Sequence, residues 1–101
     1  MPLVRAGSLD QLPPGTVMPV DIGPQTFAVC NVAGELHALE GICPHAGGPL
    51  GDGALHGHTL VCPWHAWEFD CRTGANDFDP EVRVETFSAH VEDGEILIEI
   101  P

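Results

Sequence analysis

The sequence predicts an all-β fold with two small antiparallel sheets and an inserted, loop-rich segment, residues 41–74, between them. Two observations lead to this prediction. Turn-forming Gly, Pro, Asn and Asp recur about every 8 to 12 residues, a rhythm typical of all-β domains. No amphipathic stretch of helical length competes with it. Because the chain has 101 residues, we expect a single domain over 1–101.

Ahead of the insert, period-two alternation and turn residues predict four strands. A helical turn is expected to begin at Ser8 and to stop at Pro13-Pro14-Gly15. Ala33-Gly34 predicts a hairpin turn between the last two strands. The four strands are expected at Leu3–Ala6, Thr16–Ile22, Gln25–Val32 and Glu35–Leu39.

After the insert, two further strands are expected at Val82–Val91 and Glu95–Ile100. Asp93-Gly94 separates them, and Asp-Gly favours a two-residue turn because both residues tolerate positive φ. Along the last strand, isoleucines occupy every second position. One face of that strand is therefore expected to lie in the core.

Charge narrows the classes of partner. The chain has 15 acidic and 3 basic residues, no lysine, and a formal net charge of −12. Such a surface repels phosphate backbones and anionic lipids, so we expect neither nucleic acid nor membrane partners. A partner protein with a basic docking face is its natural complement. No stretch approaches the roughly 18 apolar residues that span a bilayer, and the first residues lack a secretory signal, so we expect a cytoplasmic protein.

The insert carries two boxes of metal-ligating residue types. One is Cys43-Pro44-His45 and the other is Cys62-Pro63-Trp64-His65, with sixteen residues between His45 and Cys62. The short spacing within each box lets a thiolate and an imidazole point inward from one loop, and the long gap lets two loops face each other. Metal binding is favoured over disulfides for such a Cys/His cluster. Zinc accepts the same ligands, so the spacing leaves a zinc site open.

The pattern Cys-x-His, sixteen residues, Cys-x-x-His resembles the Rieske motif, in which two cysteines hold one iron of a [2Fe–2S] cluster and two histidines hold the other. The resemblance extends through Phe69-Asp70 and Arg72-Thr73-Gly74 and suits the flanking β rhythm. It implies one [2Fe–2S] cluster as cofactor, with four metal ligands: Cys43, His45, Cys62 and His65.

Departures from the respiratory Rieske pattern refine what the resemblance implies. Respiratory members have an extra cysteine in each box and join the two by a disulfide; here Gly48 and Trp64 stand at those positions. Trp67 and Phe69 replace a Ser and a Tyr that donate hydrogen bonds near the cluster, which implies a reduction potential toward the low end of the roughly −150 to +300 mV Rieske range. Ala66 stands where the family often has Gly; a positive φ there would cost about 1 kcal/mol.

The resemblance implies a monomeric electron carrier between a flavin reductase and a terminal oxygenase. The sequence shows no nucleophile–base pair and no nucleotide-binding glycine loop, so we expect a component of an oxidoreductase system that is not itself an enzyme. Two alternatives stay open. One is a small subunit or accessory domain of a larger reductase such as nitrite reductase, and the other is a zinc-stapled binding module.

Four residues outside the boxes carry their own expectations. Cys30 lies in an apolar strand and is expected in the core. Cys71 follows Asp70 in an expected turn, where it could be exposed. His56 and His58 flank a glycine in an expected small hairpin and are expected to face solvent rather than bind metal.

Overall fold

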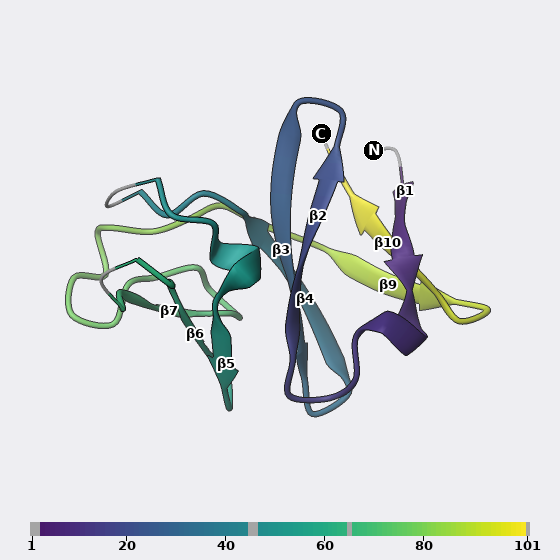
Figure 1. Cartoon of the computed structure of the whole chain (residues 1–101), viewed down its shortest axis with the longest axis horizontal. Helices are drawn as coiled ribbons and strands as arrows, with labels where there is room; N and C mark the ends of the chain where they lie inside the picture. The colour runs from purple at the N-terminus through teal and green to yellow at the C-terminus, as the bar shows by residue number, and fades with distance from the viewer. Residues whose placement is uncertain (1–2, 45–46, 65, 101) are drawn as a thin grey trace.

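A computed structural model describes residues 3–44, 47–64 and 66–100, which form ten strands in three antiparallel sheets (Figure 1). The predicted all-β class is confirmed. Two single turns of 3-10 helix, η1 (Leu9–Gln11) and η2 (Leu50–Asp52), are the helical elements of the described part. Within those same residues, no helix is long and apolar enough to cross a membrane.

The first sheet has the order β1-β10-β9. The turn between β9 and β10 is the predicted one, with φ of 50° at Asp93 and 77° at Gly94. The predicted helical turn is η1, where the Ser8 side chain accepts from the Asp10 N–H and the Gln11 side chain accepts from the Ser8 N–H. The strands are β1 (Leu3–Ser8), β9 (Ala89–Glu92) and β10 (Glu95–Glu99).

The second sheet lies at the centre of the molecule and has the order β2-β3-β4-β8. Its β3–β4 hairpin turns at Ala33 and Gly34, with φ of 52° and 96°, as predicted. The strands are β2 (Val17–Ile22), β3 (Gln25–Val32), β4 (Glu35–Glu40) and β8 (Thr86–Phe87).

The single strand predicted at Val82–Val91 is wrong. The chain changes sheet at Ser88: Phe87 of β8 pairs with Ala38 of β4, and His90 of β9 pairs with Leu97 of β10. Residues 82–84 instead bond to the insert, where the N–H of Val84 donates to the Gly74 carbonyl at 2.9 Å. Across Ser88 the alternation of Phe87, Ala89 and Val91 continues, whereas the shift of phase lies earlier, between Val84 and Phe87.

The insert is more regular than the loop-rich segment predicted, because it contains a third sheet of order β5-β6-β7. Its strands have three residues each, too short for alternation to reveal. The small hairpin expected around His56 and His58 joins β5 to β6, with φ of 62° at Gly57. The strands are β5 (Ala54–His56), β6 (Thr59–Val61) and β7 (Glu68–Asp70).

Strand β3 joins two buried clusters because successive side chains point to opposite faces of its sheet. Phe27 and Val29 belong to the cluster shared with the first sheet, whose β10 contributes Ile96 and Ile98. Ala28 and Cys30 belong to the cluster shared with the insert. The central sheet is therefore covered on both faces, with the insert on the side away from β1, β9 and β10 (Figure 1). The insert-side cluster comprises Ala28, Cys30, Leu39, Cys43, Leu50, Leu60, Cys62, Phe69, Cys71 and Val84.

Candidate metal centre

Cys43 and Pro44 of the first box lie in the loop between β4 and η2. An isolated bridge between Ile42 and Pro49 closes the loop. Inside it, the N–H of Cys43 donates to the Gly48 carbonyl at 2.9 Å, and the N–H of Gly47 donates to the Cys43 carbonyl at 2.8 Å. Gly47 has φ of 76°, a left-handed conformation that glycine adopts without steric cost. These contacts hold Cys43 at 1% exposure.

Cys62, Pro63 and Trp64 of the second box lie in the loop between β6 and β7. The N–H of Cys62 donates to the Trp67 carbonyl at 2.8 Å, which closes the loop. The N–H of Trp64 points at the Cys62 sulfur, 3.4 Å away. Ala66 has φ of 57°, so the positive φ considered for this position is present and costs about 1 kcal/mol in a residue with a Cβ.

The two loops meet at Gly48. A Cβ on Gly48 would lie 2.8 Å from the Cys62 sulfur and 3.0 Å from Cγ of Trp64. Burial raises the pKa of the Cys62 thiol and the neighbouring Cys43 thiol raises it further, while the hydrogen bond from the Trp64 N–H acts in the opposite direction. Two buried thiols thus lie together where the loops touch. A metal that binds there takes them as thiolates and displaces their protons.

The described residues fit the cysteine side of an iron–sulfur cluster. Thiolates are the ligands such clusters use, and N–H groups aimed at sulfur tune them. His45 and His65, the other two predicted ligands, lie outside the described residues. Among the residues that are described, no group of three or more His, Cys, Asp or Glu side chains could hold a metal ion. The structure therefore brings together Cys43 and Cys62 of the predicted set.

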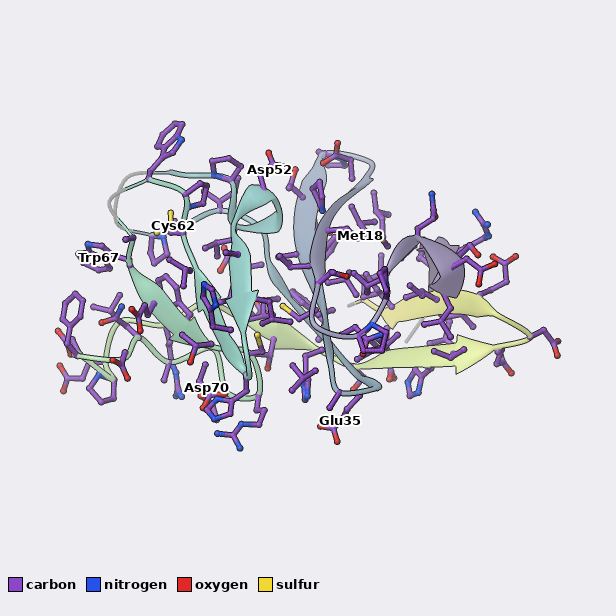
Figure 2. The ribbon with its side chains drawn as sticks, turned by 60° about the horizontal axis from the view of Figure 1, so that its bottom comes forward. Met18, Glu35, Asp52, Cys62, Trp67 and Asp70 are labelled. Atoms are coloured by element: carbon purple, nitrogen blue, oxygen red, sulfur yellow. The ribbon has the colours of Figure 1, made fainter. Side chains whose placement is uncertain are left out.

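Apolar side chains surround this end of the insert. Trp64 is 49% exposed and Ile42 is 47% exposed. The ring of Trp67 meets that of Phe78 edge to face, with centroids 5.0 Å apart. Figure 2 shows Cys62 and Trp67 at one end of the third sheet and Asp70 at the other.

The far end of the insert is fixed by a turn that follows β7. The carboxylate of Asp70 accepts from the backbone N–H of Arg72 at 2.8 Å and from its guanidinium at 2.9 and 3.1 Å. These bonds to Arg72 hold the pKa of Asp70 below its usual value, and the nearby His58 contributes to the shift. Phe69-Asp70 and Arg72 of the family-like stretch thus have structural roles here.

Cys71, which could have been exposed, is fully buried. Its N–H donates to the His58 carbonyl at 2.9 Å, and its side chain joins the insert-side cluster. His58 is half-exposed and lies 3.7 Å from Asp70, whereas His56 is exposed as expected.

Asn76 is a positioning residue that the sequence analysis missed. It is 2% exposed; its amide N–H donates to the Glu68 carbonyl at 3.0 Å, and its amide oxygen accepts from the N–H groups of Phe78 and Asp79. The side chain therefore ties β7 to the segment that presents Phe78 to Trp67. An Asn in a turn-rich stretch, with Asp and Pro following it, was the available signal.

Comparison with known proteins agrees with the geometry. A model of the Rieske [2Fe–2S] domain family matches residues 3–88. The ferredoxin component of biphenyl 2,3-dioxygenase from Rhodococcus jostii is 33% identical over 99% of this chain and 94% of its own length.

Solved structures give the same picture. The ferredoxin of carbazole 1,9a-dioxygenase from Nocardioides aromaticivorans matches with a TM-score of 0.87 and 31% identity, over 97% of both chains. A chain in the complex of reduced oxygenase and oxidized ferredoxin in carbazole 1,9a-dioxygenase matches with a TM-score of 0.85 and 28% identity, over 95% of this chain and 91% of that one. A protein assigned as an NADH-dependent nitrite reductase small subunit from Mycobacterium tuberculosis has a TM-score of 0.85 at 24% identity, over 96% and 93%, a likeness of fold alone.

Proposed function

The chain belongs to the Rieske [2Fe–2S] domain family, and on that premise we propose that it carries single electrons from a flavin reductase to a terminal oxygenase. Its cofactor is one [2Fe–2S] cluster, and it is an electron carrier rather than an enzyme in its own right. The observation that carries the proposal is the match to a dioxygenase ferredoxin component over 99% of this chain and 94% of that protein.

The ligand assignment is part of the proposal: Cys43 and Cys62 bind one iron, and His45 and His65 bind the other. Support comes from the burial of both cysteines at 1% exposure, where the loops touch. When bound, the cluster supplies one-electron chemistry. The protein's own part is to exclude water from the cysteines and to aim the Trp64 N–H at the Cys62 sulfur.

We further propose that the chain acts as one unit over 1–101, with the cluster carried by about 41–74, and that it works as a cytoplasmic monomer. All four cysteines are free, which suits a reducing compartment. The net charge of −12 favours redox partners with basic docking faces, because opposite fields raise the rate of encounter.

The alternatives have weaker support. The likeness to the nitrite reductase small subunit is one of fold, which does not distinguish a fixed subunit from a shuttle. Gel filtration from native cells separates them, since a shuttle elutes as a free monomer. A zinc-stapled module accounts for the ligand types but not for the match to a [2Fe–2S] family.

The test is an electron-transfer assay with the purified holoprotein. NADH, a flavin-dependent ferredoxin reductase and cytochrome c are mixed with the wild type, with Cys62→Ser, or with the control His56→Ala, which alters an exposed histidine on β5. We expect the wild type and His56→Ala to support cytochrome c reduction and Cys62→Ser to lose it with its cluster absorbance. Equal activity of Cys62→Ser would overturn the ligand assignment. A coloured wild type that fails to pass electrons would overturn the carrier role.

A further inference from the structure

We propose that Cys30 and Cys71 form a dithiol site that a hydroperoxide oxidises reversibly to a disulfide. Their sulfurs are 3.2 Å apart and share a hydrogen bond. Cys30 comes from β3 of the central sheet and Cys71 from the turn after β7, and both are 0% exposed. Neither belongs to the proposed ligand set, so this inference stands apart from the ligand assignment.

A groove is lined in part by Cys71, so a small oxidant would approach the pair from that side. The groove has a volume of about 380 Å³ and opens along the edge where β4, β8 and β9 meet the turn after β7. Figure 2 shows Glu35 and Asp70, which precede two of the lining segments, on the same edge of the molecule. Most of the lining is polar, which suits hydrogen peroxide. Lining residues include Cys71, Arg72, His37, Phe87, Ser88 and His90.

The two thiols have different environments. The hydrogen bond with Cys30 lowers the pKa of Cys71, and the positive charge of Arg72 assists, while burial and Asp70 oppose the shift. The pKa of Cys30 is raised by the same hydrogen bond and by burial. Because Cys71 lines the groove and Cys30 does not, the Cys71 thiolate meets the oxidant first and Cys30 resolves.

The chemistry balances with the peroxide as the oxidant. The Cys71 thiolate attacks one peroxide oxygen, the O–O bond breaks, and the departing hydroxide takes a proton to become water. The sulfenic acid left on Cys71 is then attacked by the Cys30 sulfur, and the S–O bond breaks as the second water leaves with the Cys30 proton. Two electrons pass from the two sulfurs to the peroxide, and a thiol reductant reverses the change.

The bridge would tie the insert to the central sheet. To form it, the two sulfurs must approach each other from 3.2 Å to a bond length of about 2.05 Å. The loop it closes runs from residue 30 to residue 71 and contains all four proposed ligands. Closing a loop of this length restricts the unfolded chain, so the melting temperature should rise by roughly 8 to 30 °C.

Peptide mapping tests the site directly. Holoprotein is treated with stepwise amounts of hydrogen peroxide while cluster absorbance is followed, then alkylated and cleaved after acidic residues. Such cleavage places each cysteine on its own peptide, with Cys30 on residues 22–35 and Cys71 on 71–77. Cys30→Ala and Cys71→Ala are treated alongside. Each replaces a thiol outside the ligand set.

We expect a cross-linked pair of peptides 22–35 and 71–77 to appear while the cluster absorbance persists. Dithiothreitol should remove the cross-link, and neither variant should form it. Should a variant fail to fold, the wild-type map alone decides, because the linked peptides identify both cysteines. Bleaching of the cluster before the pair appears would overturn the proposal. So would over-oxidation of Cys71 without a link, or unchanged thiols at both positions.

Discussion

Gly74 offers a quantitative test of how the insert is held, because Gly57 is its matched control. Both glycines have positive φ, 78° at Gly74 and 62° at Gly57. A Cβ on Gly57 would meet nothing within 4 Å, whereas one on Gly74 would lie 2.2 Å from the carbonyl oxygen of Val84. Backbone hydrogen bonds from Gly74 to the Asp70 carbonyl at 2.7 Å and from Val84 to the Gly74 carbonyl at 2.9 Å fix that approach.

The expected losses of stability follow from the backbone strain that both positions share and from the close contact that is present at Gly74 but not at Gly57. A left-handed residue with a Cβ costs about 1 kcal/mol, so Gly57→Ala should lower the stability by that amount. Gly74→Ala carries the same strain and also forces backbone apart, at about 1 to 3 kcal/mol more. For a domain near this size each kcal/mol shifts the melting temperature by about 4 to 8 °C. We therefore expect a drop of roughly 5 °C for Gly57→Ala and roughly 10 to 25 °C for Gly74→Ala.

The assay is thermal melting of the two holoproteins at one scan rate, followed by circular dichroism and by cluster absorbance. Cluster loss should accompany unfolding at the lower temperature in Gly74→Ala, because the turn that Gly74 closes belongs to the insert proposed to carry the cluster. Equal losses in the two variants would refute the reasoning, since they would mean that the close approach to Val84 has no energetic weight.

Three further predictions concern the site and its surface. Cys62→Ser should abolish or transform the cluster spectrum while Cys30→Ala leaves it intact; the reverse result, read by absorption, would remove Cys62 from the ligand set. Asp70→Asn should destabilise the protein at neutral pH: the lowered pKa of Asp70 stabilises the fold above about pH 4 and ceases to do so as the pH falls through the folded value. Denaturant midpoints from pH 7 to 3 should thus converge with those of the wild type in acid, and a gap that stays constant would contradict this. The rate at which a partner reduces the protein, measured by stopped flow, should fall as the salt concentration rises from 0.05 to 0.5 M, because the screening length then shortens from roughly 14 to 4 Å. A rate that does not depend on salt would argue against steering by the charge of −12.

Local signals in the sequence predicted most of the fold correctly. The turns at Ala33-Gly34 and Asp93-Gly94 followed from residues that tolerate positive φ, and Ser8 marked a helical turn through its capping box. Alternation could not reveal the change of sheet at Ser88, because Phe87, Ala89 and Val91 keep one phase across it. The shift of phase between Val84 and Phe87 was the available sign that the predicted strand is not continuous. The short strands of the insert gave no pattern of useful length.

The candidate site, like the fold, was predicted from the sequence only in part. Box spacing placed Cys43 and Cys62 on two loops that face each other, and the structure has them buried together. The pairing of Cys30 with Cys71 depends on how the insert packs on β3, and no local feature of a chain encodes a contact 41 residues apart. Asn76 was missed because its importance comes from three backbone partners that only the folded turn supplies.

The most direct test of the central claim is an absorption and EPR spectrum of the purified protein before and after dithionite. We predict a brown protein that takes up one electron per chain and whose reduced form has the low average g value of a histidine-ligated [2Fe–2S] centre. A reduced spectrum typical of four cysteine ligands would contradict the assignment of His45 and His65. A colourless, EPR-silent protein that contains zinc would contradict the electron-carrier account as a whole.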